Sequence, residues 1–202
     1  MQQEIEATFL GIDHDALRAQ LKALGGTCSQ PEFLMRRAVF DYSDQRLDRQ
    51  AAWVRVRQEY DRVTMCYKQR KTSNIDGMYE VEFVVSDYDK ACGFLQAIGL
   101  EHKARQETKR ELWLLDGCQV TLDTWPWIPQ YVEIEAPDES SVRAVAQKLG
   151  FQWSNALFDS ADAVYQRYYD VTRTEISTVN LTFSPVPDWL EAKRITTKAG
   201  IL

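Results

Sequence analysis

The hydrophobic positions of the chain predict a few amphipathic helices, most of them followed by glycine. In residues 13–24, Leu17, Leu21 and Leu24 fall on one face, and Gly25 comes next. A spacing of three to four residues is typical of a helix that buries one face, and glycine is the preferred residue just beyond a helix end. The same pattern predicts helices at residues 89–98, at 138–149 and, in a tyrosine-rich segment, at about 160–170.

Alternation of polar and apolar residues predicts strands between these helices. In YVEIEAP, residues 131–137, Glu133 and Glu135 share one side while Val132 and Ile134 take the other, because strand side chains alternate between two faces. Turn-forming sequences join several segments into hairpins. The predicted strands are residues 2–10, 33–42, 51–60, 62–70, 78–86, 105–115, 118–124 and 130–136.

Nearly every predicted strand has one charged face and one apolar face. Glu4 and Glu6 flank Ile5, and Arg55 and Arg57 flank Val56. The same spacing of charged or polar residues recurs at Lys68 with Arg70, Glu80 with Glu82 and Thr121 with Asp123, while Arg36 or Arg37 and Arg110 join from further strands. A solvated sheet face explains any single pair.

The helices favour an enclosed arrangement for the whole set. Their leucine faces need a broad apolar surface, and the apolar face of the sheet is the one available. The charged faces then point to the other side of the sheet. About eight strands can close into a barrel with room for a small ligand. We therefore expect an α+β fold, with an eight-stranded antiparallel closed β-barrel and helices packed on its outside.

Composition excludes several classes of protein. The chain has 202 residues, of which 45% are hydrophobic, enough for an ordered globular core. A net charge of −6 argues against general binding to nucleic acid or to an anionic membrane. No apolar run approaches the ~18 residues of a membrane span, and the acidic amino terminus is unlike a signal peptide. Cys28, Cys66, Cys92 and Cys118 form no CxxC pair, so we expect reduced thiols in a cytoplasmic protein.

Familiar catalytic motifs are missing from the sequence. The chain has only two histidines, His14 and His102, which rules out a multi-histidine metal site. Its nine glycines include no G-x-S-x-G elbow, P-loop or G-x-G-x-x-G loop. The familiar phosphate-cradling loops are therefore absent from the sequence.

The signs of the charges on the predicted strands are sorted by strand, with Arg55, Arg57 and Lys68 close together in the sequence and most acidic residues elsewhere. Burying like charges without a counter-ion is costly. An interior that holds both groups is explained if it receives a polyanion and a divalent cation. Phosphate oxygens bind arginine and lysine, and carboxylates together with phosphate oxygens hold Mg²⁺ or Mn²⁺. A triphosphate supplies both partners.

Seven segments carry a resemblance to a known family. In order along the chain, EIEATF, WVRVRQE, YKQR, YEVEF, KRELW, VTLDTW and YVEIEAP resemble the motifs of the CYTH superfamily over roughly residues 2–170. Members of that superfamily are class IV adenylyl cyclases, thiamine triphosphatases and inorganic triphosphatases. The resemblance implies an antiparallel eight-stranded tunnel. We expect one such domain at residues 1–171 and a C-terminal extension at residues 172–202, packed on the domain as an edge strand and arm or capping the tunnel.

Carried over by position, the resemblance implies a role for each charged residue of these motifs. The implied metal ligands, for Mg²⁺ or Mn²⁺, are Glu4, Glu6, Asp123, Glu133 and Glu135. The implied triphosphate-binding residues are Arg36, Arg55, Arg57, Lys68 and Arg110, to which strand phase adds Arg70. Glu80 and Glu82 would orient the basic residues or bind a second metal. The predicted catalytic residues are Lys68, Asp123 and Glu135.

Two positions depart from the family pattern. The amino-terminal motif of the family is ExExK, whereas Thr8 stands here at the position of the lysine. Loss of the ammonium removes a charge-assisted hydrogen bond of about 1.5–3 kcal/mol, and Arg70 and Lys71 are the candidates to compensate for it. Thr108 precedes Arg110 in the same strand phase, where relatives often have lysine.

Three functions are compatible with these residues. The first is metal-dependent hydrolysis of an inorganic or small organic triphosphate, such as tripolyphosphate or thiamine triphosphate. The second is an adenylyl cyclase that converts ATP to cyclic AMP and pyrophosphate, although the sequence identifies no adenine pocket. The third is a polyphosphate- or nucleotide-binding module with little turnover. We favour hydrolysis and expect a small-molecule triphosphate as partner, neither nucleic acid nor membrane, with a homodimer left open.

Overall fold

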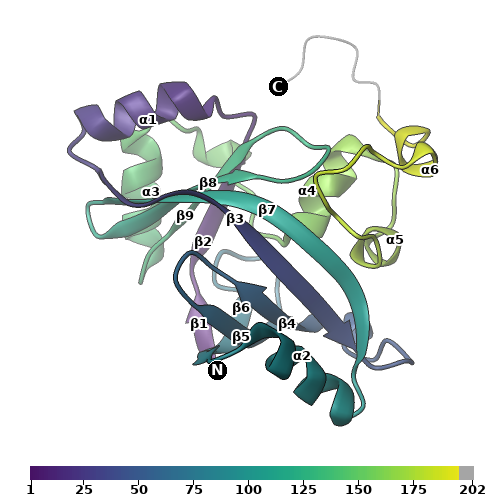
Figure 1. The fold of residues 1–202 in the computed structure, drawn as a ribbon. Coiled ribbons are helices and arrows are strands. Elements are labelled where there is room, and N and C mark those ends of the chain that lie inside the picture. Colours follow the sequence, from purple (N-terminus) through teal and green to yellow (C-terminus); the bar gives the residue numbers. More distant parts are fainter. Residues whose placement is uncertain (196–202) are drawn as a thin grey trace.

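The computed structural model describes residues 1–195, in which one antiparallel sheet of nine strands curls into a nearly closed barrel (Figure 1). The strands run in the order β1-β6-β5-β4-β3-β7-β8-β9-β2. They are β1 (Gln2–Glu4), β2 (Glu6–Leu10), β3 (Thr27–Asp41), β4 (Ala52–Gln58), β5 (Val63–Arg70), β6 (Met78–Val85), β7 (Glu101–Leu115), β8 (Cys118–Thr124) and β9 (Tyr131–Glu135). The predicted antiparallel barrel with outer helices is confirmed.

The amino-terminal segment closes the barrel. β1 pairs with β6, placing Gln2 opposite Glu80, and β2 pairs with β9, placing Glu6 opposite Glu135. These two short strands are the halves of the single strand predicted at residues 2–10, separated at Ile5. The expected count of eight is therefore one too low, because the segment changes hydrogen-bonding partners at its middle.

Two strands begin earlier than the sequence pattern indicates. β3 starts at Thr27 and β7 at Glu101, and the two pair along almost their whole length. The register of β3 shifts between Cys28 and Gln30 and again between Gln30 and Phe33. Such bulges disturb the alternation of side chains, which explains why the first part of β3 could not be recognised as a strand.

Four helices confirm the predicted ones: α1 (His14–Ala23), α2 (Tyr88–Ala97), α3 (Glu139–Lys148) and α4 (Ala161–Tyr168). The first three begin after Asp13, Asp87 and Asp138, whose carboxylates accept backbone N–H groups of the first turn. This is the usual cap at a helix start. A glycine with positive φ follows each of them, at Gly25, Gly99 and Gly150.

The helices cover the outer face of the barrel. α1 and α3 pack over β2, β8 and β9, where Leu21 and Val145 join Val132 in one buried cluster. α2 covers β4 and β7, with Leu95 against Phe40. Figure 1 shows these two groups of helices at opposite ends of the sheet. Because the apolar strand faces are used by the helices, the charged faces are left to point inward.

Two short 3₁₀ turns, η1 (Asp48–Gln50) and η2 (Trp153–Asn155), lie in connections between the other elements.

The carboxyl-terminal segment forms two short helices, α5 (Arg173–Ser177) and α6 (Asp188–Glu191). The prediction of an edge strand in this segment is therefore wrong. Within the described residues, this segment makes only one strand-like contact with the barrel. It is an isolated parallel bridge from Leu181 to β7, with hydrogen bonds of 2.7 and 2.9 Å. Leu181 and Leu190 are buried in a cluster with Tyr165 of α4. Residues 196–202 of the predicted extension lie outside the described residues. Within residues 1–195, no helix has the length and apolar character needed to cross a membrane.

Leu21→Ala tests the packing of α1 on the barrel. Leu21 is fully buried, so the truncation should lower the free energy of unfolding by about 2–5 kcal/mol in urea denaturation. Leu34→Ala is the matched control, because Leu34 is 50% exposed on the barrel surface, and it should cost about 0.5 kcal/mol or less. Equal losses in the two variants would contradict the described core.

Candidate functional site

The barrel encloses a cavity of about 320 Å³, which we call the barrel cavity. This volume lies in the range of small-molecule sites, roughly 300–1,000 Å³. Residues from nearly all strands line it, and most of the lining side chains are charged. The charged faces of the strands therefore meet in an interior.

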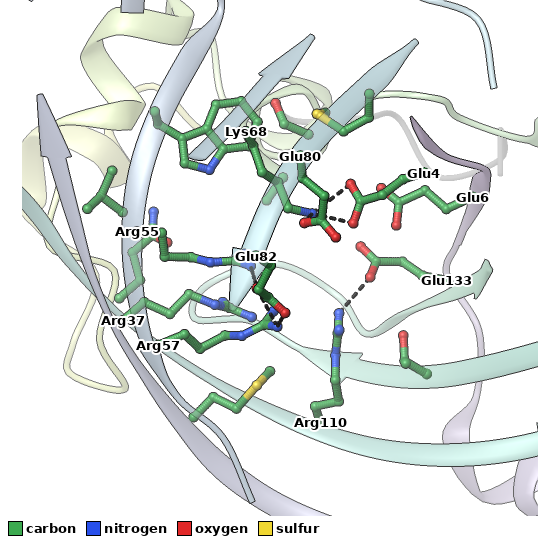
Figure 2. Close-up of a pocket in the computed structure, with 18 of the residues that line it drawn as sticks. Glu4, Glu6, Arg37, Arg55, Arg57, Lys68, Glu80, Glu82, Arg110 and Glu133 are labelled. Atoms are coloured by element: carbon green, nitrogen blue, oxygen red, sulfur yellow. Dashed lines mark hydrogen bonds and ion pairs between the residues drawn. The ribbon is translucent and has the colours of Figure 1, made fainter. Parts of the chain in front are cut away.

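One side of the barrel cavity, the basic half, is formed by the adjacent strands β5, β4, β3 and β7. It carries Lys68, Arg55, Arg57, Arg37 and Arg110. Figure 2 shows Arg37, Arg55 and Arg57 extending side by side into the cavity from the left. Their backbones are neighbours in the sheet, with Arg37 directly opposite Arg57. The basic residues are thus concentrated on one continuous part of the wall.

The opposite side, the acidic half, is formed by β6, β1, β2 and β9, which are adjacent through the closure of the barrel. Its lining carboxylates are Glu80, Glu82, Glu4, Glu6, Glu133 and Glu135. In Figure 2, Glu4, Glu6 and Glu133 face the arginines across the cavity. The sequence predicts that basic and acidic residues lie on different strands, and the structure places these two sets of strands on opposite walls of the cavity.

Ion pairs connect the two halves. Lys68 Nζ lies 2.6 Å from Glu4 and 3.2 Å from Glu80. Arg110 Nη2 lies 2.6 Å from Glu133, and Glu82 lies 3.1 Å from the nearest Arg55 nitrogen. Arg57 is shared between Glu82 at 3.3 Å and Glu59 at 2.5 Å. These four basic side chains are therefore each held by a carboxylate where they line the cavity.

The acidic half has more carboxylates than these cations can neutralise. Glu6 lies directly opposite Glu135 in the sheet, and like charges in that position repel. Burial, together with Glu133 and Glu4, raises the pKa of Glu6 well above its usual value. Burial and Glu4 also raise the pKa of Glu135. Burial opposes ionisation of Glu4 as well, but Lys68 outweighs it and the pKa of Glu4 is lowered.

Ten of the predicted site residues line the barrel cavity together. They are Glu4, Glu6, Arg55, Arg57, Lys68, Glu80, Glu82, Arg110, Glu133 and Glu135. Three others, Arg36, Arg70 and Asp123, do not line it.

Arg36 is placed on the outer surface, and Arg37 takes the interior position. Arg36 is exposed, donates a hydrogen bond to Gln58 and lies over the Tyr88 ring. The phase is set by Ala38 and Phe40, which pack under α2 and so put every second residue, including Arg36, on the outside. The sequence conceals this phase because Val39, which lines the cavity, is also apolar. The predicted triphosphate-binding residue Arg36 therefore lies outside the barrel cavity, and Arg37 is the arginine of this pair that lines it.

Asp123 and Arg70 support the site from its margins. Asp123 is fully buried, and its carboxylate accepts hydrogen bonds from Arg110 at 2.8 and 2.9 Å and from Thr121 at 2.7 Å. In this arrangement Asp123 orients Arg110 from behind. Arg70 pairs with Asp159, which also binds Arg173 of α5 at 2.7 Å. Arg70 thus ties β5 to the segment around α4 and α5.

The two threonines that depart from the family pattern are enclosed by the fold. Thr8 is buried and exchanges backbone hydrogen bonds with Leu157 at 2.9 and 3.0 Å. Thr108 is completely buried, and its hydroxyl has no partner within the described residues. Neither residue lines the barrel cavity.

Besides Arg37, Glu59 and Trp125 are among the lining residues that the sequence analysis did not identify. Glu59 follows β4 and accepts hydrogen bonds from Arg57 and Thr64. Trp125 follows β8, with its ring 4.7 Å from the Arg37 guanidinium. A signal for Glu59 was available in the sequence, since it continues the alternation of Arg55 and Arg57 by two residues. Trp125 stands after the end of β8, where alternation gives no information.

The donor atoms of Cys66, Glu80 and Glu82 lie within 4.8 Å of one another and form a second arrangement that a metal could use. Both glutamates are already paired with Lys68, Arg55 or Arg57. Thiolates favour softer metals than Mg²⁺. The cluster is thus poorly suited to a hard cation such as Mg²⁺.

Comparison with protein families places the whole barrel in one of them. The model of the CYTH domain matches residues 2–169, which include all nine strands. The chain belongs to the CYTH family. A search of curated protein sequences finds no significant match.

Solved structures with the CYTH fold resemble this one at low sequence identity. A proposed adenylate cyclase from Vibrio parahaemolyticus is 16% identical with a TM-score of 0.69, over 82% of this chain and 98% of that one. The PH1012 protein from Pyrococcus horikoshii OT3 is 18% identical with a TM-score of 0.65, over 78% and 96%. A proposed adenylyl cyclase from Hippeastrum, described as having a dominant triphosphatase activity, is 14% identical with a TM-score of 0.54, over 83% and 96%. At these identities the similarity is one of fold.

Glu59→Gln tests the electrostatics of the CYTH cavity wall. Burial opposes ionisation of Glu59, but Arg57 and its hydrogen bonds outweigh burial and lower the pKa of Glu59 to about 2. A carboxyl group whose pKa is lower in the folded state stabilises the fold above its unfolded pKa and loses this contribution as the pH falls. The variant should therefore be about 1–2 kcal/mol less stable at pH 7.

The difference in the free energy of unfolding should shrink below about pH 4.5 and disappear near pH 2. Urea denaturation across this range measures it, with the exposed Glu101→Gln as control. A difference that stays constant with pH would contradict the ionised Arg57–Glu59 pair.

Proposed function

We propose that this CYTH domain binds a triphosphate together with a divalent metal ion in the barrel cavity and hydrolyses the terminal phosphoanhydride bond. The observation that carries the proposal is the separation of charge across one enclosed cavity, with guanidinium and ammonium groups on one wall and carboxylates on the other. A metal-bound triphosphate is complementary to both walls, because its oxygens bind the cations and its metal binds the carboxylates.

In this proposal, Arg55, Arg57, Lys68 and Arg110 bind the phosphoryl oxygens. Arginine offers a planar pair of donors that matches two phosphate oxygens, and lysine offers a compact charge. Glu82 and Glu80 hold Arg55 and Lys68 in the direction of the cavity. The side chains are thus oriented before the substrate arrives, which lowers the cost of ordering them on binding.

In this proposal, the carboxylates of Glu4, Glu6, Glu133 and Glu135 would hold the divalent metal. They come from three neighbouring strands of the acidic half. Among the described residues, neither Glu6 nor Glu135 has a cation within 4 Å. Oxygen donors of this kind suit Mg²⁺ or Mn²⁺. A bound divalent cation would neutralise charge on the phosphoryl oxygens and lower the pKa of a bound water.

The chain itself supplies two further elements of the reaction. Glu135 has no cationic partner in residues 1–195, so its carboxylate is available to accept the proton of the attacking water. Lys68 projects from the opposite wall and stabilises negative charge on the transferred phosphoryl group. Hydrolysis rather than cyclisation is favoured by the Hippeastrum relative, which is described as having a dominant triphosphatase activity.

Product analysis tests this proposal. Purified protein is incubated with Mg²⁺ or Mn²⁺ and, in separate reactions, tripolyphosphate, thiamine triphosphate or ATP. Orthophosphate release that requires the metal is the expected result. Cyclic AMP with pyrophosphate from ATP would show a cyclase instead, and binding without any product would show a binding module.

Glu135→Gln should lower metal-dependent turnover by about 100-fold or more, because the carboxylate that accepts the proton is lost. The folded state should persist, as measured by circular dichroism and thermal unfolding. Glu139→Gln is the control, since Glu139 lies four residues away on the exposed surface of α3, and its activity should match that of the unaltered protein. Full activity in Glu135→Gln would refute the assigned role.

A further inference from the structure

Arg37 differs from every other cation of the basic half. Arg55, Arg57, Lys68 and Arg110 each have a carboxylate within 4 Å. Within residues 1–195, Arg37 has no such partner and makes no hydrogen bond, although only 3% of its surface is exposed. Its Nε and Nη1 are enclosed without an acceptor, which leaves Nη2 as the nitrogen that reaches the cavity.

The charges around Arg37 make this arrangement costly. Burial, followed by Arg55, Arg57 and Arg110, lowers the pKa of Arg37 well below its ordinary value. Asp123 is the acidic neighbour that partly offsets them, but Arg110 occupies its carboxylate. A buried cation without a counter-ion is unfavourable by several kcal/mol. The ligand-free fold therefore carries a cation whose partner is not supplied by the described part of the protein.

The surroundings of Arg37 lack acceptors and hold further donors. Its guanidinium stacks on the Trp125 ring at 4.7 Å, which fixes the plane of the group. Trp125 Nε1 and Arg55 Nε, like the enclosed nitrogens of Arg37, are buried without a partner in residues 1–195. All of these atoms are hydrogen-bond donors. What the pocket requires is a group with several acceptor oxygens and negative charge.

We propose that Arg37 is an additional anion-binding residue of the barrel cavity and that it holds one phosphoryl group of the polyphosphate against the Trp125 wall. This inference rests on the proposed function, since it assigns one group of the same ligand. Binding would provide the counter-ion that the fold lacks, and Nη2, the nitrogen that reaches the cavity, would donate a charge-assisted hydrogen bond to a phosphoryl oxygen. Arg37 would thus reduce the stability of the empty barrel and increase affinity for the ligand.

Isothermal titration calorimetry with inorganic tripolyphosphate tests the proposal, in EDTA and in Mg²⁺. Arg37→Met removes the charge and keeps much of the volume, so its affinity should fall about 10- to 100-fold. Arg36→Met is the matched control, because it removes the adjacent arginine from the outer face of the same strand, and its affinity should stay within twofold.

Thermal unfolding without ligand gives an independent measurement. Arg37→Met should unfold at a higher temperature than the unaltered protein, because a buried unpaired cation has been removed. A lower unfolding temperature would mean that Arg37 has a structural role and would overturn the proposal. If Arg37→Met cannot be purified, Arg37→Lys keeps the charge without the planar donors and should show a smaller loss of affinity, about 3- to 10-fold.

The outcomes separate this inference from the proposed function. If the unaltered protein binds tripolyphosphate and Arg37→Met binds it equally well, the Arg37 inference fails while triphosphate binding stands, and ordered water is the partner of Arg37. If the unaltered protein binds tripolyphosphate in neither condition, the proposed function fails and the inference fails with it.

Discussion

The barrel depends on charge neutralisation across an enclosed space. The cations of the basic half and the carboxylates of the acidic half face each other inside the wall, where either group alone would be too costly to bury. The pairs Lys68–Glu4 and Arg110–Glu133 join opposite walls and make the interior tolerable. Because the two groups lie on separate, continuous sets of strands, neutralisation is incomplete at each wall. Within residues 1–195, Arg37 is left without a carboxylate partner on one side, and Glu6 and Glu135 are left without a cation on the other.

The outer layer makes this interior possible. The strands have one apolar face each, and α1, α2 and α3 cover those faces from outside. With the apolar residues used there, the interior needs no hydrophobic filling and can hold ligand. The carboxyl-terminal segment extends this layer, since Leu181 and Leu190 pack with α4. Arg173 and Arg70 share Asp159 where this segment meets the barrel. The extension is thus joined to the site by both apolar and ionic contacts.

Most of the fold and most of the site can be predicted from the sequence, because both follow from the alternation of polar and apolar residues along the strands. Arg55, Arg57, Glu133 and Glu135 stand in regular strands, and their inward direction follows from the apolar residues between them. Alternation fails where an apolar residue also faces inward, as Val39 does, and this moved the assignment from Arg37 to Arg36. It fails again at the bulges of β3 and at the break at Ile5. Alternation also cannot show that the carboxylate of Asp123 already accepts hydrogen bonds from Arg110.

The closure by β1 and β2 has a consequence for how the chain folds. Residues 2–10 pair with β6 and with β9, so Glu6 can meet Glu135 only once the chain has been made as far as β9. Contacts between such distant parts of the chain form slowly, because a long loop has to be closed first. On the ribosome, β1 lacks its partner until β6 has emerged, and β2 lacks its partner until β9 has emerged. The acidic wall of the cavity is therefore assembled from strands far apart in the sequence, and it cannot be complete before β9 has been made.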